Sequence, residues 1–295
     1  MIIGMFFFIF LTNLLYYIMK KIFTLTLILF VFLTFAQKKE KVKGSKIVTM
    51  EQKQIESFEN LEVEDNLEIF LVKGNECAIE IEADDNLHEF IEYKLAGNTL
   101  RLSTTREIIN AKKLSVRVTY TDDFKMVIAK NEANITALSD VVLENVTFKT
   151  YDYSKLYLNA STKMFTLMAS DKSKIELNLK SEKTAIDLSK SAQLKALIAT
   201  LHMKFDMYEK ANATVEGDVM ELKLRLDNNS NFIGKNLNAK NAALVSEAYS
   251  NLSLLVTDKT VIDASGKSEI QLYGEPKIEL KRFAESAVLM KKPSK

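Results

Sequence analysis

Apolar and polar residues alternate along most of this chain, and from about residue 130 the alternation repeats with a fixed period. Four near-copies show the pattern: YSKLYLNA at 153, KSKIELNL at 172, YSNLSLLV at 249 and KSEIQLYG at 267. Period-two alternation is typical of β-strands with one buried face. The sequence therefore predicts a strand in each copy, with its polar side chains facing outward.

The period can be measured when the copies are aligned on the apolar residue that follows a small one. These anchor residues are 18 to 21 positions apart: Ile135, Leu156, Ile175, Leu194, Ala213, Phe232, Leu252, Ile270 and Val288. Two places before each anchor there is only Ala or Ser: Ala133, Ser154, Ser173, Ala192, Ala211, Ser230, Ser250, Ser268 and Ser286. A fixed period indicates that each unit covers the apolar edge of its neighbour, as in a solenoid.

We therefore predict an all-β fold, a single-chain β-solenoid (β-helix) with about 19 residues per coil over residues 126–290. The Ala/Ser column would lie at a tight corner facing inward, where a larger side chain would collide with those above and below. Two other folds have a similar period. Leucine-rich repeats need an L-x-x-L-x-L-x-x-N spacing that the copies lack, and repeated antiparallel hairpins favour Asn-Gly or Asp-Gly turns, which are absent from the sequence.

Residues 56–125 have another pattern. LEIFLVKGNECAIEIEA and EFIEYKLAGNTLRLST alternate on both sides of a Gly-Asn pair, which suits a type II′ hairpin turn, and LSVRVTY follows at 114–120. We predict N-terminal hairpins that cover the first coil, since an open sheet edge invites pairing with other chains. Residues 37–55 are predicted to be a linker, and residues 291–295 a tail whose lysines and proline protect the other end.

The N-terminal region has the order of a secretory signal peptide. Residues 19–37 read MKKIFTLTLILFVFLTFAQ, with two lysines, an apolar run and small residues before Gln37. We assign residues 1–36 to the signal peptide, place the true start at Met19 and predict cleavage after Ala36. The protein would then be exported, to the periplasm or to the cell surface in association with the outer membrane. The alternative is that the apolar residues before Met19 make the leader an uncleaved membrane anchor.

Composition narrows the possible chemistry. Lys plus Arg (40) nearly equal Asp plus Glu (39), so no net field favours nucleic acid. The single cysteine, Cys77, cannot form an internal disulfide and is predicted to be buried in a strand. The chain has two histidines, His88 and His202, which excludes a multi-histidine metal site. We predict no cofactor and no metal.

The N-terminal strands carry a pattern that can be compared with known families. Its positions are Phe58, Leu61, Val63, Leu67, Ile69, Leu71 and Gly74, then Ile79, Ile81, Ala83, Asp84, Asn86 and Leu87, and then Ala96, Gly97, Asn98, Thr99 and Leu100. This pattern, the later coils and Gly274-Glu275-Pro276-Lys277 resemble the head GIN domain, a family described as auto-transporter adhesins. The resemblance covers about residues 56–290. It implies an exported β-helical protein of a Gram-negative bacterium, and it supplies no catalytic residues.

On a solenoid, function comes from outward columns of side chains in adjacent coils. Asp187 and Asp206 would be stacked neighbours, with Arg225 one coil beyond and Lys204 and Lys223 on the same face. Stacked carboxylates could share a Ca²⁺ ion or act as an acid and a base on a glycan. They could equally belong to a solvated surface on which opposite charges balance.

Tyrosines near the first coils offer a second possibility. Tyr151, Tyr153 and Tyr157 could stack on sugars, or they could pack beneath the N-terminal hairpins. We predict a non-catalytic module for binding or adhesion, with an envelope protein or a surface glycan as its partner. Two alternatives remain: a glycan lyase or hydrolase built on a β-helix, and a structural envelope protein anchored by its leader.

Overall fold

The protein is described from a computed structural model that places residues 16–23 and 39–293. The chain divides into two units, Met1–Glu40 and Lys41–Lys295. The first contains a helix over residues 16–23. No helix among the residues described is both long and apolar enough to cross a bilayer. The rest of the predicted leader, including the cleavage position after Ala36, lies outside the described residues.

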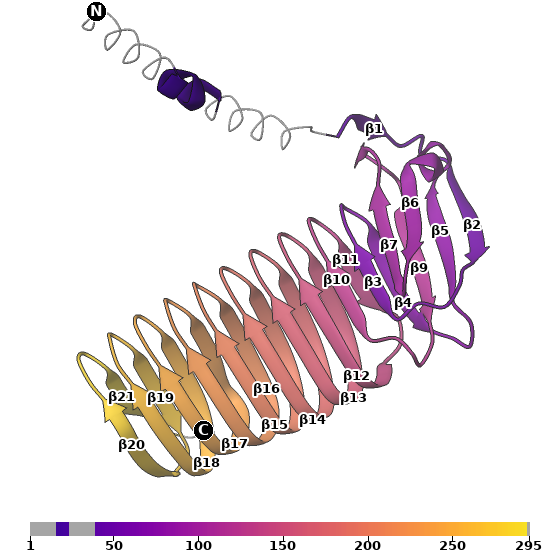
Figure 1. Cartoon of the computed structure of the whole chain (residues 1–295). Coiled ribbons are helices and arrows are strands. Elements are labelled where there is room, and N and C mark those ends of the chain that lie inside the picture. Colours follow the sequence, from indigo (N-terminus) through magenta and orange to yellow (C-terminus); the bar gives the residue numbers. More distant parts are fainter. Residues whose placement is uncertain (1–15, 24–38, 294–295) are drawn as a thin grey trace, which may run out of the picture. The chain divides into compact units, whose positions relative to one another are not determined.

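The second unit is a β-solenoid (Figure 1). Its central coils each contain one long strand: β13 (Lys155–Ala169), β14 (Lys174–Leu188), β15 (Gln193–Met207), β16 (Asn212–Leu226), β17 (Asn231–Ser246) and β18 (Asn251–Ala264). Neighbouring strands pair in parallel, and Lys155 lies beside Lys174, which lies beside Gln193, an offset of 19 residues. The predicted solenoid and its period are confirmed. Antiparallel hairpins are excluded for these coils.

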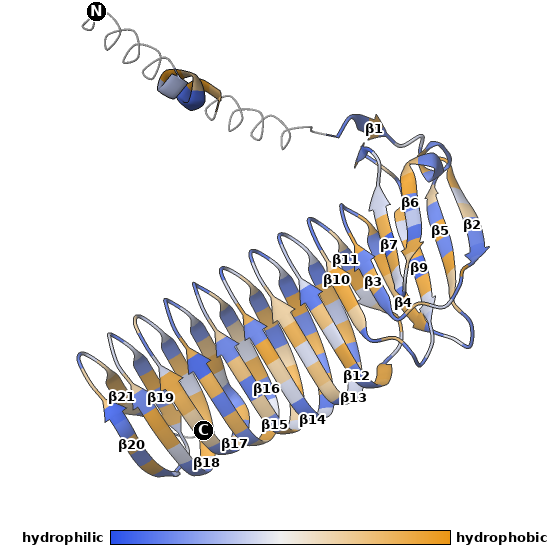
Figure 2. Ribbon diagram, viewed as in Figure 1, coloured by the Kyte–Doolittle hydropathy of each residue, from blue (hydrophilic) through white to orange (hydrophobic). Residues whose placement is uncertain are grey.

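Each long strand bends near its middle. In β13, inward and outward positions alternate except at Lys163 and Met164, two consecutive exposed residues between the buried Thr162 and Phe165. This shift lets the segment before the bend and the segment after it both point apolar side chains inward. Figure 2 shows apolar and polar residues alternating along the strands. Phe205, in the second segment of β15, and Phe232, in the first segment of β17, meet edge to face with ring centroids 5.3 Å apart. The two segments of each coil therefore form opposite faces around one apolar interior.

A tight turn joins each coil to the next, and the Ala/Ser column lies there. The amide of Ser154 donates to the carbonyl of Tyr151 (3.1 Å), and Asp152 within this turn has a positive φ of 57°. The column is fully buried in eight coils: Ala133, Ser154, Ser173, Ala192, Ala211, Ser230, Ser250 and Ser268. The prediction of an inward-facing corner is confirmed.

The N-terminal strands form the first coils of the stack and cover them. These strands are β1 (Lys41–Lys43), β2 (Val48–Gln54), β3 (Asn60–Val63), β4 (Glu68–Lys73), β5 (Ala78–Asp84), β6 (Ile91–Ala96), β7 (Thr99–Thr104), β8 (Glu107–Ile109), β9 (Leu114–Tyr120), β10 (Met126–Ala129), β11 (Asn134–Ala137) and β12 (Val141–Thr150), with a short 3-10 helix at Asp85–Phe90. β3 and β4 pair with β10 and β11 on one side and with β7 and β9 on the other, all in parallel. β6 then pairs antiparallel with β7, and β5 with β9 and β2.

Two expectations for this region were wrong and two were confirmed. Gly97-Asn98 closes a two-residue hairpin between β6 and β7, with Gly97 at φ 57°. Gly74-Asn75 closes no hairpin, because β9 lies between β4 and β5. Residues 37–55 are not a linker: they contain β1, paired with β8, and β2, paired with β5. Cys77 is buried, as predicted.

The last full coil contains β19 (Glu269–Tyr273) and β20 (Lys277–Phe283), and β21 (Val288–Lys291) begins the next one. Ile262 pairs with Leu280, but Asp263 pairs with Arg282, so β20 holds one extra residue. This bulge shifts the following register by one position. The last anchor is therefore Leu289, the partner of Ile270, and not Val288, as the sequence alignment had it. The turn residue of this coil is likewise Ala287 and not Ser286.

Candidate functional site

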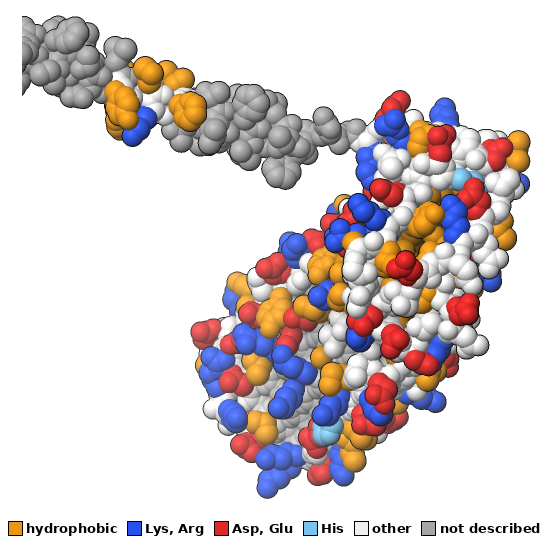
Figure 3. Space-filling view, turned by 45° about the vertical axis from the view of Figure 1, so that its right-hand side comes forward, with side chains coloured by type: hydrophobic (Ala, Val, Ile, Leu, Met, Phe, Trp, Pro, Cys, Tyr) orange, Lys and Arg blue, Asp and Glu red, His pale blue; other side chains and the backbone are white. Residues whose placement is uncertain are grey.

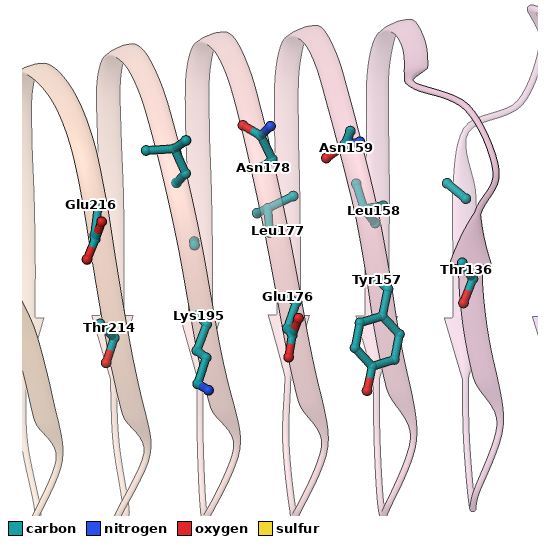
Figure 4. Close-up of a pocket in the computed structure, with 13 residues that line it drawn as sticks. Thr136, Tyr157, Leu158, Asn159, Glu176, Leu177, Asn178, Lys195, Thr214 and Glu216 are labelled. Atoms are coloured by element: carbon teal, nitrogen blue, oxygen red, sulfur yellow. The ribbon is translucent and has the colours of Figure 1, made fainter.

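The outward side chains of the first segments form two parallel rows across successive coils. One row contains Thr136, Tyr157, Glu176, Lys195 and Thr214, and the other contains Asn159, Asn178, Leu197 and Glu216 (Figure 4). These residues line a groove of about 560 Å³, here called the polar groove. Because neighbouring strands lie about 4.8 Å apart, five coils give the groove a length of roughly 20 Å.

The polar groove holds side chains that the fold does not use. No hydrogen bond or ion pair links the side chains of Tyr157, Asn159, Glu176, Asn178 or Lys195 to any residue that the structure describes. Glu176 and Lys195 are neighbours in register and still form no ion pair. These donors and acceptors therefore remain available to a ligand.

Some charged residues elsewhere on the solenoid form ion pairs across coils. Lys190 lies 2.6 Å from Asp171, and Arg282 lies 2.6 Å from Asp263. Amide side chains do the same, since Asn241 donates to Glu221 over 2.8 Å. In the polar groove, by contrast, even the adjacent Glu176 and Lys195 are unpaired.

The five residues singled out from the sequence lie together on the second-segment face. Asp187 pairs in register with Asp206, which pairs with Arg225, and Lys204 pairs with Lys223 two positions away. The Nζ atom of Lys204 lies 2.6 Å from Oδ2 of Asp206. Stacking of the two carboxylates is therefore present, and one of them is held by a lysine.

The environments of the two carboxylates differ. Partial burial raises the pKa of Asp187, and the charge of Asp206 raises it further, while Lys204 acts in the opposite direction. Asp206 in turn raises the pKa of Lys204. A carboxyl group with a raised pKa beside an ionised one could donate a proton to a bound group. Neither Asp187 nor Asp206 lines the polar groove.

The guanidinium of Arg225 forms its ion pair with Glu247 and not with Asp187 or Asp206. Its Nη2 atom donates to Oε2 of Glu247 (3.0 Å), and its guanidinium lies 5.9 Å from the centre of the Tyr208 ring. Glu247 also accepts from Arg282 (2.8 Å). Among the residues described, no three His, Cys, Asp or Glu side chains gather at a possible metal site. A cation at Asp187 and Asp206 would find two carboxylates, whereas Ca²⁺ takes six to eight oxygen ligands.

Residues 57–276 match the sequence family described as "Putative auto-transporter adhesin, head GIN domain". The chain belongs to the head GIN domain family. No curated protein matches this head GIN domain chain.

Solved structures with similar folds include two described as putative adhesins. One is from Parabacteroides merdae (14% identity, TM-score 0.64, covering 86% of this chain and 99% of the other). The second is from Parabacteroides distasonis (14% identity, TM-score 0.67, covering 85% and 100%). A third, from Parabacteroides distasonis, is described as a putative lipid binding protein (12% identity, TM-score 0.53, covering 85% and 97%). At such identities the likeness establishes the fold of the head GIN domain chain alone.

Sequence reasoning found only one member of the polar groove. Of the three tyrosines considered, Tyr157 lines it, whereas Tyr153 lies at a turn with 57% of its surface exposed. The groove rows stand one and three positions after the anchors, so the same alignment contained the signal. Those columns vary in residue type along the stack, which is why a search for recurring residues did not select them.

Proposed function

We propose that this head GIN domain protein is an exported, non-catalytic adhesion module that binds a glycan of the cell envelope or cell surface through the polar groove. The observation that supports this proposal most directly is the set of side chains around Tyr157 that have no partner among the described residues. The family description as an adhesin supports a binding role. The predicted leader supports export.

The chemistry of the groove suits a sugar chain. Tyr157 offers an aromatic ring, whose apolar body can lie against a sugar while its free hydroxyl bonds to a sugar hydroxyl. Asn159 and Asn178 each carry a donor and an acceptor, and Glu176 accepts hydrogen bonds, which is what a hydroxyl-rich ligand requires. A protein partner would instead favour an apolar centre with charges at its rim. Here the centre is occupied by Glu176, Lys195 and Asn178.

Binding of the purified protein to an array of envelope polysaccharides and host-surface glycans tests this proposal. Tyr157→Ala should weaken binding by about tenfold or more, because about 1.4 kcal/mol corresponds to a factor of ten. Tyr153→Ala is the matched control: this tyrosine is exposed outside the groove and contacts Lys172, with its ring centre 5.0 Å from Nζ. Equal loss in both variants, or no glycan bound at all, would refute the proposal.

A glycan lyase or hydrolase is the second candidate, and the raised pKa of Asp187 beside Asp206 favours it. The double variant Asp187→Asn/Asp206→Asn separates the two functions. An adhesion module keeps its glycan binding in this variant, and the wild type releases no new reducing or unsaturated ends from the bound glycan. Cleavage by the wild type that disappears in the double variant would establish the enzyme.

Export itself has a direct test. N-terminal sequencing of the protein recovered from cells should begin at Gln37. A protein that retains the leader would support the third candidate, a structural envelope protein anchored in the membrane.

A further inference from the structure

A second groove lies on the second-segment face, which points away from the polar groove. Its volume is about 580 Å³. Its charged and polar lining comes from two rows of outward side chains, Lys183, His202, Glu221, Asn241 and Lys259 in one, and Lys204 and Lys223 in the other. We call this the basic groove, and in Figure 3 blue side chains gather near the pale blue histidine on the solenoid.

The basic groove places like charges side by side. Lys204 and Lys223 are partners in adjacent strands. Like charges directly opposite one another in a sheet are destabilising. Opposite charges can also meet between adjacent coils of this solenoid, as Lys190 and Asp171 do. The fold therefore carries an unfavourable arrangement here that an anionic ligand would relieve.

Only part of this positive charge is neutralised by the protein. Lys204 is held by Asp206 (2.6 Å), and Lys259 by Glu279 (2.9 Å). Lys183 and Lys223 form no ion pair or hydrogen bond with any residue of the described chain. The one acid in the lining, Glu221, is already engaged by Asn241 (2.8 Å).

The hollow has a structural cause. Ala185 and Ala243 stand at either end of the row that contains Lys204 and Lys223. The long side chains of Lys204 and Lys223 are thus flanked by two short ones, and the small Ala243 side chain leaves space beside Lys223. Of the apolar lining residues, Met203, Leu222 and Ala242 are buried, whereas Ala243 is exposed and Val261 is partly exposed.

We propose that the basic groove binds an acidic polysaccharide, a polymer of carboxylate-bearing sugars, along the stack of coils. One lysine lies on each of three successive coils, Lys183, Lys204 and Lys223, and neighbouring strands are about 4.8 Å apart, which suits charges repeated along a chain more than a single ion. Nucleic acid is disfavoured because the lining contains no aromatic side chain on which bases could stack. A membrane surface is disfavoured because the apolar lining residues that reach the surface, Ala243 and Val261, are small, whereas helices that insert into lipid carry Trp, Phe or Leu.

Calorimetric titration of the purified protein with polygalacturonate oligomers tests this assignment. The wild type should bind them, with an affinity that falls as salt rises because the charges are exposed. It should not bind neutral dextran oligomers of the same length. Lys183→Glu/Lys223→Glu should weaken binding by about tenfold or more, since a tenfold change corresponds to about 1.4 kcal/mol.

The matched control is Lys174→Glu/Lys180→Glu, which makes the same change in charge on the opposite face, where both lysines are exposed. It should bind polygalacturonate as the wild type does, and circular dichroism should show both double variants folded. Equal weakening in the two double variants would show a general charge effect and overturn the proposal. So would the absence of polygalacturonate binding, or equal binding of single-stranded DNA or of vesicles containing phosphatidylglycerol. Tyr157→Ala should leave this binding intact, so that failure of the polar groove and failure of the basic groove are distinguishable.

Discussion

The two ends of the solenoid close its apolar interior differently. At the N-terminal end, β7 and β9 lie on β3 and β4, and β5 and β6 then continue the sheet with antiparallel pairing. Leu102 in β7 is fully buried. At the C-terminal end, β20 and β21 pair only with the preceding coil. There the inward positions Ile278, Leu280 and Phe283 are 44%, 51% and 41% exposed.

This difference shows that burial in a solenoid is a property of the neighbouring coil. Leu224 and Leu280 occupy one inward column, yet the first is 1% exposed and the second 51%. The open end instead carries devices that discourage pairing with another sheet edge: Lys277, Lys281 and Arg282 on β20, and the bulge within it. Side chains at equivalent positions of the repeat therefore contribute unequally to the free energy of unfolding.

The largest expected difference in stability is between two Leu→Ala substitutions in the same inward column, one at the centre of the stack and one at its open end. Leu224→Ala should lower the free energy of unfolding by about 2–5 kcal/mol, because it leaves a cavity between Phe205 and Leu244. Leu280→Ala should cost less than about 1 kcal/mol, since half of its side chain is already in water. Urea denaturation monitored by circular dichroism measures both. Equal costs would mean that the C-terminal end is covered in solution.

Two glycines allow the same comparison for the backbone. A Cβ atom on Gly217 would lie 2.2 Å from the carbonyl oxygen of Ile198, and one on Gly274 would lie 2.2 Å from that of Val256, both at positive φ. Gly217→Ala should cost about 1–3 kcal/mol in backbone strain, and more if the neighbouring coil must shift. Gly274→Ala should cost less, because the last coil can move away from the stack. Thermal unfolding of the two variants tests this order, and a larger loss for Gly274→Ala would contradict it.

The N-terminal end depends on a single buried carboxylate. Asp84 is fully buried, and its oxygens accept hydrogen bonds from the backbone amides of Lys46 (2.9 Å), Lys112 (3.0 Å) and Lys113 (3.0 Å). Burial raises its pKa, but the three amides together outweigh burial, and the pKa of Asp84 is lowered. Its contribution to stability is therefore fully present above the pKa of the unfolded chain, near 3.8, and is lost as pH falls toward the lower folded value.

Asp84→Asn should remove that acid dependence. At neutral pH it should also cost about 1–3 kcal/mol, because an amide group cannot accept from all three donors. Hydrogen exchange measured by mass spectrometry should show faster exchange in β2, β5 and β9 and little change in β14–β18. Faster exchange throughout the stack would mean that the covering strands and the coils unfold as one unit. A pH profile of stability unchanged by the substitution would contradict the role of Asp84.

The fold was predictable where each coil repeats its neighbour. Alternation and period placed the inward columns from Ile135 to Ile270 correctly, because parallel in-register strands stack like on like. The bulge at β20 has no sequence signal, since its extra residue lies among polar and charged side chains. The sequence predicts a linker where β2 lies because its residues, VTMEQKQ, are mostly polar. The strand is held by pairing with β5 and buries almost none of its side chains.

The candidate sites were predictable in part. The register that stacks Asp187 on Asp206 follows from the anchors, as does the proximity of Lys204 and Lys223. Which neighbours are left unpaired does not follow. Glu176 and Lys195 are adjacent in register and form no ion pair, whereas Lys190 reaches Asp171, and this outcome depends on side-chain conformations in three dimensions.

The smallest expected change in stability concerns the Ala/Ser column at the corner, where one substitution should stabilise the protein. Ser173 is fully buried, and its hydroxyl has no hydrogen-bond partner among the described residues, whereas the next coils carry Ala192 and Ala211 at the same place. Ser173→Ala should therefore raise the free energy of unfolding by up to about 1 kcal/mol, because an unsatisfied buried hydroxyl is removed. Ser250 provides the contrast. Its hydroxyl donates to the carbonyl of Glu247 (2.8 Å) and lies 2.9 Å from that of Ser246.

Ser250→Ala should accordingly lower stability by about 1 kcal/mol, since Ser246 would lose its buried partner. Parallel urea denaturation of the two variants decides the matter. If both substitutions destabilise, the Ser173 hydroxyl has a partner in solution, such as a bound water, and the corner is polar by requirement. If Ser173→Ala stabilises as expected, small size alone governs the corner, because every coil there lies against the backbone of the next.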